Sequence, residues 1–156
     1  MRKVWAPKGE RPVAQVHHRY EWLYLYAFAN PQTGRSVFYI LPNVDTESLS
    51  RVLENLALEL SASKDHALLL VLDQAGWHTP DRLRIPEGIE LLFLPSHSPE
   101  LQPAEHLWAL TDEPLVNRSF SDLDELQEIL SDRCAYLRTQ PDLITEHTLF
   151  HWWPLT

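Results

Sequence analysis

The sequence has a single cysteine, no long apolar run and fewer basic than acidic residues. One cysteine, Cys134, excludes an internal disulfide and favours a reducing, cytosolic compartment over secretion. The longest apolar run, residues 67–72, is far shorter than the ~18–20 residues that a membrane-spanning helix needs. The first residues also lack the apolar segment of a secretory signal. We therefore expect a soluble protein with no membrane contact.

The charge balance limits the kind of nucleic-acid contact that the chain can make. Its 13 Lys and Arg residues against 22 Asp and Glu residues give a net charge of −9. A chain of this charge does not attract phosphates as a whole, so any nucleic-acid role must depend on a local site. The remaining composition is ordinary: 156 residues, 44% hydrophobic and 22% charged, predict one globular domain with one core.

The order of the hydrophobic patterns predicts a mixed α/β fold. Aromatic and β-favouring residues predict two strands, and the turn residues 30–34 between them predict a hairpin. Asp45 is placed to cap a helix with an apolar stripe, and Ser121 to cap another. The expected elements are strands at 20–29 and 36–41, a helix from 45 to about 61, strands at 66–73 and 89–94, and helices at 104–110 and 121–138.

This element order predicts a three-layer α/β/α sandwich around one mixed central sheet. The continuous apolar run at 66–73 is typical of a parallel strand that is covered on both faces. A hairpin beside a parallel strand pair normally has a further strand between them. We therefore expect that the first strand of the sheet is missing from these residues.

Two acidic residues are the strongest candidates for chemistry. Asp73 ends the buried strand, where ligands of open α/β sheets gather, and Glu105 lies in the first turn of the helix that Pro103 opens. Carboxylates on separate rigid elements can converge on Mg²⁺, which prefers oxygen ligands. Both residues also have a structural interpretation. Glu105 can form a capping box with Gln102, and Asp73 can cap the turn that follows it.

Three further groups of residues are more typical of packing than of chemistry. The histidines match no compact zinc motif, and the aromatic residues on one side of the first strand more often pack on a helix than stack on bases. A cysteine within an amphipathic helix, with no visible histidine partner, is typical of a buried structural thiol. The residues concerned are His78, His97, His106, His147, His151, Tyr20, Trp22, Tyr24, Tyr26 and Cys134.

Two segments together carry a family resemblance. Residues 70–78 contain an Asp at a strand end followed by Gln-Ala-Gly-Trp-His, and residues 94–108 contain Ser-Pro-Glu-Leu-Gln-Pro-Ala-Glu-His-Leu-Trp. This pair resembles the catalytic domain of DDE transposases, in the bacterial insertion-sequence branch of the mariner superfamily. Residues 4–12 resemble the stretch just after the first Asp of that family. The resemblance implies an RNase H-like fold, with residues 1–156 as a single catalytic domain that is incomplete at its N-terminus.

The resemblance assigns roles to the two acids. Asp73 matches the second catalytic carboxylate of the family and Glu105 the third, and both are Mg²⁺ or Mn²⁺ ligands there. The family's first Asp and its helix-turn-helix region lie upstream of the segment that residues 4–12 resemble, so neither transfers to this sequence. Gln74, Ser96, His97 and Gln102 depart from the family pattern.

The resemblance also implies a function and partners. We expect metal-dependent DNA strand cleavage and transfer in transposition, weak or absent in the isolated chain because one carboxylate is missing. The expected partners are transposon-end and target DNA, and either a second copy of the chain or an upstream N-terminal transposase fragment, in the bacterial cytoplasm at the nucleoid. The alternative is an inactive transposase relic that acts as an RNase H-like module for binding nucleic acid or protein.

Overall fold

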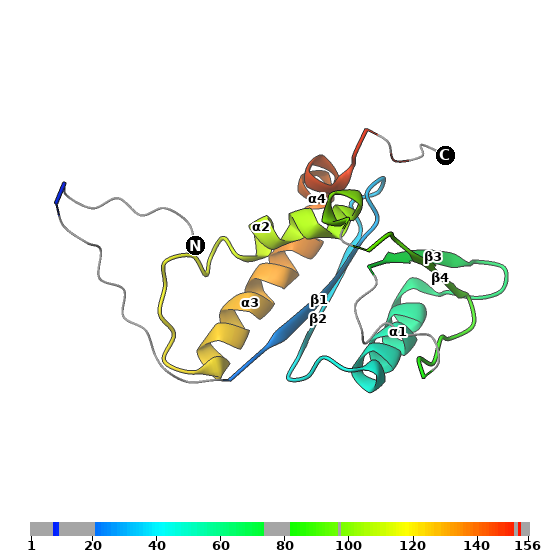
Figure 1. Ribbon diagram of the computed structural model, residues 1–156, viewed down its shortest axis with the longest axis horizontal. Coiled ribbons are helices and arrows are strands. Elements are labelled where there is room, and N and C mark those ends of the chain that lie inside the picture. Colours follow the sequence, from blue (N-terminus) through cyan, green and yellow to red (C-terminus); the bar gives the residue numbers. More distant parts are fainter. Residues whose placement is uncertain (1–7, 10–20, 74–81, 97, 152, 154–156) are drawn as a thin grey trace.

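The computed structural model describes residues 8–9, 21–73, 82–96, 98–151 and 153, and it is of the mixed α/β class that the sequence predicts (Figure 1). Tyr20, His78 and His97 lie outside these residues. The elements in order are β1 (Tyr24–Ala29), β2 (Ser36–Leu41), α1 (Thr46–Leu60), β3 (Leu68–Leu72), β4 (Ile89–Phe93), the 3₁₀ helices η2 (Pro99–Leu101) and η3 (Pro103–His106), α2 (Leu107–Thr111), α3 (Leu123–Arg138) and α4 (Pro141–Thr148).

The predicted hairpin is confirmed. β1 and β2 pair antiparallel from Tyr24 opposite Leu41 to Ala29 opposite Ser36, so the first strand begins four residues later than predicted. The Asn30 side chain fixes the turn, because its Oδ1 accepts hydrogen bonds from the backbone N–H groups of Gln32 and Thr33. Gly34 supplies the left-handed backbone that closes the turn, with φ of 68°.

Helix α1 forms as predicted, with Asp45 as its N-cap. The Asp45 carboxylate accepts a hydrogen bond of 2.7 Å from the N–H of Ser48, and the helix ends at Ser61 in the left-handed conformation. Most of its apolar stripe is buried, with Leu49 and Leu53 at 1% and 0% exposure, but Leu58, which the helical spacing assigns to the same stripe, is 78% exposed. This stripe is the centre of one hydrophobic cluster, which Tyr26 of β1 and Leu68 and Leu70 of β3 join.

The parallel pair β3–β4 is covered on one face only within the described residues. Leu68, Leu70 and Leu91 pack on the α1 cluster. Alternate residues point the other way, and Leu69 and Leu92 are 62% and 49% exposed. The expectation that this strand is covered on both faces is therefore wrong for these residues. The reason is that α1 covers one face, whereas the later helices pack on the hairpin instead.

Helices α2, α3 and α4 pack on the opposite face of the hairpin from α1. Their buried residues form a second cluster with Ala27, Ala29 and Phe38 of the hairpin. The buried members are Leu107, Leu110, Leu137 and Ile144. Figure 1 shows α1 on one side of β1 and β2 and the other three helices on the other side.

The strands form two separate two-stranded sheets, β1–β2 and β3–β4. No strand in the described part of the chain joins the two sheets by hydrogen bonds. The RNase H-like arrangement around one continuous central sheet therefore stays a prediction.

The last helices correct two details of the sequence-based assignment. Asp122, rather than Ser121, is the N-cap of α3, because it has the extended backbone of a cap and its Oδ1 accepts from the N–H of Glu125 at 2.9 Å. Glu125 in turn accepts from the N–H of Ser121, which completes a reciprocal cap. Helix α4 was not predicted. It begins at Pro141, in the first-turn position that tolerates proline.

Candidate active site

Asp73 lies immediately after β3, at the carboxyl end of the parallel pair, and it is exposed. This is the edge of an α/β sheet at which ligands bind. The alternative role for Asp73, as a cap of the following turn, involves residues 74–81, which lie outside the described residues. Its position is thus compatible with ligand binding.

Glu105 is half-buried in η3, where its carboxylate is held by a tryptophan. The indole Nε1 of Trp108 donates a hydrogen bond of 3.1 Å to Oε2 of Glu105. The capping-box interpretation of Glu105 is wrong, because the N–H of Gln102 donates to the Pro99 carbonyl and the Gln102 side chain makes no capping hydrogen bond.

Trp108 is a residue that the sequence reasoning did not assign to the site. Its place three residues after Glu105 was the available signal, since residues three apart on a helix face are neighbours. This hydrogen bond restrains the orientation of the Glu105 carboxylate. Trp108 is therefore a positioning residue for this carboxylate.

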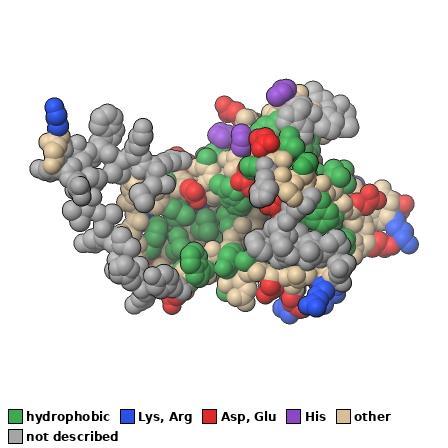
Figure 2. Space-filling view, viewed as in Figure 1, with side chains coloured by type: hydrophobic (Ala, Val, Ile, Leu, Met, Phe, Trp, Pro, Cys, Tyr) green, Lys and Arg blue, Asp and Glu red, His purple; other side chains and the backbone are tan. Residues whose placement is uncertain are grey.

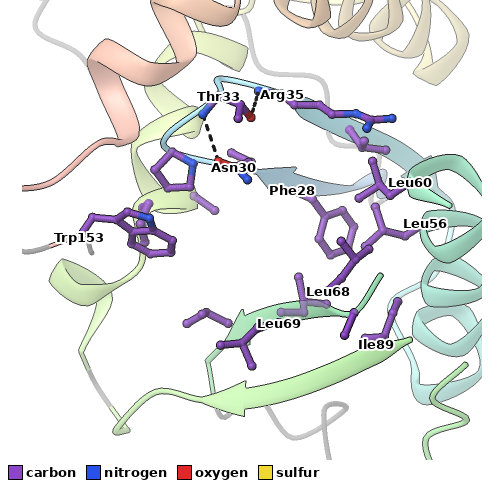
Figure 3. Close-up of a pocket in the computed structure, with 18 of the residues that line it drawn as sticks. Phe28, Asn30, Thr33, Arg35, Leu56, Leu60, Leu68, Leu69, Ile89 and Trp153 are labelled. Carbon is purple, nitrogen blue, oxygen red and sulfur yellow. Dashed lines mark hydrogen bonds between the residues drawn. The ribbon is translucent and has the colours of Figure 1, made fainter. Parts of the chain in front are cut away.

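The elements that carry the two acids line the same cavity, which has a volume of about 510 Å³ (Figure 3). Val71, two residues before Asp73, is part of its wall, and so is Ala104, which precedes Glu105. Phe28 and Ala29 of β1, and Leu56 and Leu60 of α1, line other parts of the cavity. β3 and η3 thus border one cavity, but neither Asp73 nor Glu105 is among the described residues that line it.

The carboxylates of Asp73 and Glu105 suit a hard divalent cation, but two carboxylates are few ligands for such an ion. Carboxylate oxygens are the ligands that Mg²⁺ prefers. Within the part of the chain that the structure describes, no group of three or more His, Cys, Asp or Glu residues is arranged to hold a metal ion. Asp73 and Glu105 therefore make up, at most, part of a metal site that needs a further ligand.

His106 and His147 make hydrogen bonds and ring contacts within the fold. Nδ1 of His106 lies 2.9 Å from the carbonyl oxygen of His147, and Nδ1 of His147 lies 2.9 Å from that of Leu143. A carbonyl oxygen only accepts, so both rings carry their proton on Nδ1 and donate. The His106 ring also meets Phe150 edge to face, at 4.8 Å between centroids. The His106–His147 hydrogen bond joins η3 to α4, whereas the His147–Leu143 hydrogen bond lies within α4.

The packing interpretation is confirmed for Tyr26 and Cys134 but is wrong for Trp22. Tyr26 packs on the α1 cluster, whereas Trp22 precedes the strand and is 65% exposed. Cys134 is buried in α3, and this burial raises the pKa of its thiol to about 11. The thiol therefore stays protonated and unreactive at neutral pH.

Carboxylates engage most of the basic side chains that the structure describes. On the face in Figure 2, Lys and Arg side chains at the right and lower margins lie beside Asp and Glu. The Glu59 carboxylate, for example, pairs with Arg138 and accepts a hydrogen bond from Tyr39. The ion pairs are Arg51–Glu47, Lys64–Glu87, Arg84–Glu47, Arg84–Glu54, Arg118–Glu125, Arg133–Glu113 and Arg138–Glu59.

None of the described helices combines the length and the apolar character that crossing a membrane requires.

Comparisons with known proteins place the chain in a family. Residues 1–127 match the family described as DDE superfamily endonuclease. The chain is also 42% identical over 109 residues to the uncharacterized protein y4pE/y4sA of Sinorhizobium fredii, an alignment that covers 67% of this chain and 77% of the relative. No solved structure matches the chain. The match over most of the sequence shows that this protein belongs to the DDE superfamily of endonucleases.

Proposed function

We propose that this chain is the catalytic domain of a transposase that cleaves and joins DNA strands with Mg²⁺ or Mn²⁺. The observation that carries the proposal is the placement of the two acids. In a member of the DDE endonuclease family, Asp73 directly follows β3 and Glu105 lies in η3, and both of these elements line one cavity. The proposal includes an RNase H-like sheet in which a further strand lies between β1 and β3.

The chain's own residues would hold and orient the metal. Asp73 offers an exposed carboxylate at the sheet edge, and Glu105 offers one that Trp108 orients. A divalent ion held there supplies activation of a water or a 3′-hydroxyl and stabilisation of the leaving oxygen in phosphodiester transfer. Because two carboxylates hold such ions less firmly than three, we expect little or no cleavage by the 156-residue chain alone.

Metal binding tests the proposal without relying on catalysis. We would titrate the chain with Mn²⁺ and follow the relaxation of water protons by the paramagnetic ion. Asp73→Asn and Glu105→Gln each remove one anionic ligand, and each is expected to weaken Mn²⁺ binding about tenfold or more, ~1.4 kcal/mol. Trp108→Phe, which leaves the ligands in place, is expected to have a smaller effect.

The control for this titration is Glu100→Gln. Glu100 is an exposed acid in η2, a few residues from Glu105, and it is expected to leave Mn²⁺ binding unchanged. Equal binding by the chain and by the Asp73→Asn variant would show that the assigned site is wrong. Nicking of transposon-end DNA at a rate that Asp73→Asn does not alter would lead to the same conclusion.

A second candidate function is an inactive module that binds nucleic acid or protein. It is favoured by the small ligand set in the described residues, where no group of three or more His, Cys, Asp or Glu side chains is arranged to hold a metal ion. Filter binding to DNA over a salt series separates the two candidates from a chain that does not bind DNA. DNA binding without Mn²⁺ binding would favour the module, and the logarithm of its affinity would fall linearly with the logarithm of salt concentration.

A further inference from the structure

The element that carries Glu105, η3, is too short to fix its own position. It is a 3₁₀ turn of four residues, Pro103–His106, and its N-cap Gln102 makes no side-chain capping hydrogen bond. Turns of this kind have poorer hydrogen-bond geometry than α-helices and seldom extend beyond four residues. The place of η3 in the fold therefore depends on its contacts with other elements.

The two ends of η3 are anchored in the hydrophobic core. Pro103 is buried, and Leu107, which follows η3, is fully buried in the same cluster as Ile144 of α4. Between these anchors, Glu105 is half-buried and His106 is exposed. Because a 3₁₀ helix has three residues per turn, these two side chains leave η3 in different directions.

His106 connects η3 to the last turn of α4. Its Nδ1 donates a hydrogen bond of 2.9 Å to the carbonyl oxygen of His147, which is 41 residues further along the chain. Carbonyl groups in the last turn of a helix lack a partner within that helix, so His106 supplies a missing donor. The His106 ring also contacts Phe150, which follows α4. Figure 1 shows α4 beside α2, the helix that continues η3.

Helix α4 is itself held in place by the hairpin and the core. The Pro141 backbone lies so close to the hairpin turn that a Cβ on Gly34 would be 1.9 Å from the Pro141 carbonyl oxygen. Further along the helix, Ile144 is fully buried beside Leu107 in the second hydrophobic cluster. The last turn of α4 therefore presents a carbonyl group at a fixed position, and His106 binds to it.

Helix α4 lies beyond the part of the chain that matches the endonuclease family. The match covers residues 1–127, whereas α4 and Phe150 come after it. The hydrogen bond of His106 therefore joins the segment that carries Glu105 to a part of this chain that the family match does not include.

We propose that His106 is a positioning residue that holds η3 against α4 and thereby keeps the Glu105 carboxylate within reach of Trp108. Trp108 lies in α2, and its indole N–H donates to that carboxylate. Without the His106 hydrogen bond, η3 is free to unwind from the start of α2, which separates the two groups. The proposal rests on the proposed function for the role of Glu105 as a metal ligand, but its first test needs no metal.

The Trp108 indole N–H reports the position of Glu105 in the metal-free chain. We would measure the exchange of this proton with water by ¹⁵N NMR, and assign its signal by its absence in Trp108→Phe. Glu105→Ala removes the acceptor and gives the exchange rate of the free indole. His106 is exposed, so His106→Ala should fold, and it is expected to speed exchange threefold to tenfold, the range that one hydrogen bond supports. An unchanged rate would overturn the proposal.

Two matched variants separate the hydrogen bond of His106 from its ring contact. His106→Asn keeps an N–H donor close to the place of Nδ1 but loses the ring, and its exchange rate is expected within twofold of the parent chain. His106→Phe keeps a ring beside Phe150 but has no donor, and it is expected to exchange as fast as His106→Ala. The opposite order of the Asn and Phe variants, or equal rates in both, would overturn the proposal even if His106→Ala does not fold.

Two control variants separate positioning from a general loss of stability. His151→Ala removes another exposed histidine after α4, and it should leave the Trp108 exchange rate unchanged. Val52→Ala removes buried methyl groups from α1, on the other face of the hairpin, and it should lower the urea midpoint without changing that rate. A rise in either control as large as in His106→Ala would contradict a specific role for His106.

The Mn²⁺ titration then tests the consequence for the metal site. His106→Ala and His106→Phe are expected to weaken Mn²⁺ binding threefold to tenfold, and His106→Asn less than twofold. If Mn²⁺ binding depends on Glu105 but is the same in all three His106 variants as in the parent chain, the positioning role is wrong and the proposed function stands. If Mn²⁺ binding is absent or independent of Glu105, the proposed function is wrong, and the exchange rates alone decide whether His106 positions Glu105.

Discussion

Replacing Gly34 with alanine tests the contact between the hairpin turn and α4. Gly34 has φ of 68°, a conformation that disfavours residues with a Cβ. A Cβ at this position would lie 1.9 Å from the carbonyl oxygen of Pro141 and 2.5 Å from its carbonyl carbon. Both are backbone atoms of the first turn of α4, so a change of rotamer cannot relieve the overlap.

The expected loss of stability has two parts. The left-handed backbone costs alanine about 1–2 kcal/mol. Moving the turn away from α4 adds about 1–3 kcal/mol of overpacking strain. The free energy of unfolding should therefore fall by about 2–5 kcal/mol. With a urea dependence near 2 kcal/mol/M, the midpoint of urea unfolding should fall by about 1–2.5 M.

The control is Gly9→Ala, which carries only the backbone part of the cost. Gly9 also has a positive φ, 98°, but nothing lies within 4 Å of the position of its Cβ. Gly88→Ala should resemble Gly34→Ala, because its Cβ would lie 2.4 Å from the Ser63 nitrogen. The reasoning is refuted if the urea midpoints of the Gly34 and Gly9 variants agree within about 0.3 M, a difference of ~0.6 kcal/mol.

Three further predictions concern single groups. Tyr26→Phe removes a buried hydroxyl that has no hydrogen-bond partner in the described structure, so urea unfolding should show an unchanged or higher stability; a loss above about 1 kcal/mol would contradict this. Cys134, with its thiol pKa raised to about 11 by burial, should not react with a thiol reagent at pH 8 in the folded chain but should react in urea, and rapid native reaction would refute its burial. Hydrogen bonds from the backbone N–H groups of Ser48 and Ser121 lower the pKa values of Asp45 and Glu125 in the folded chain. Their stabilisation is thus full above the unfolded values, about 4, and is lost as the pH falls through the folded values. The urea midpoint of an Asp45→Asn, Glu125→Gln double variant should therefore fall less between pH 6 and pH 2 than that of the parent chain, and equal slopes would contradict the assignment.

The parts of the fold that short-range chemistry determines could be predicted from the sequence. The hairpin follows from an asparagine and a glycine that fix its turn, and α1 follows from Asp45 and a leucine stripe with helical spacing. In both cases the residues that form the element also carry the signal. The boundaries were less certain. β1 begins at Tyr24 rather than at residue 20, and α3 is capped by Asp122 rather than by the neighbouring Ser121.

The parts that depend on contacts between distant residues could not be predicted. Helix α4 has only eight residues and a weak apolar pattern. From the sequence, Pro141 can equally mark the end of the preceding helix α3. Helix α4 is stabilised by tertiary contacts, such as the burial of Ile144 and the docking of Gly34. The sequence predicts that the face of β3 with Leu69 is buried, whereas Leu69 is 62% exposed. A continuous apolar run does not show whether another element covers each face of the strand.

The candidate site also has a part that could be predicted from the sequence and a part that could not. The sequence indicates Asp73 and Glu105 through their places at a strand end and in a helix start, and the structure brings their elements to one cavity. The sequence alone does not reveal that Trp108 holds the Glu105 carboxylate, because a Glu three residues after Gln102 matches the capping-box pattern instead. Local competition between hydrogen-bond partners is decided by the backbone geometry of η3.

The exposed Leu69 gives the chain a practical property. In the part of the chain that the structure describes, β3 has one edge without a strand partner and an outer face on which Leu69 is 62% exposed. Such an apolar strand adheres to other strands, and four leucines and one valine do little to fix the register of that contact. The chain should therefore precipitate more readily as its concentration rises. In a cell, its survival would depend on how soon after synthesis that edge is covered.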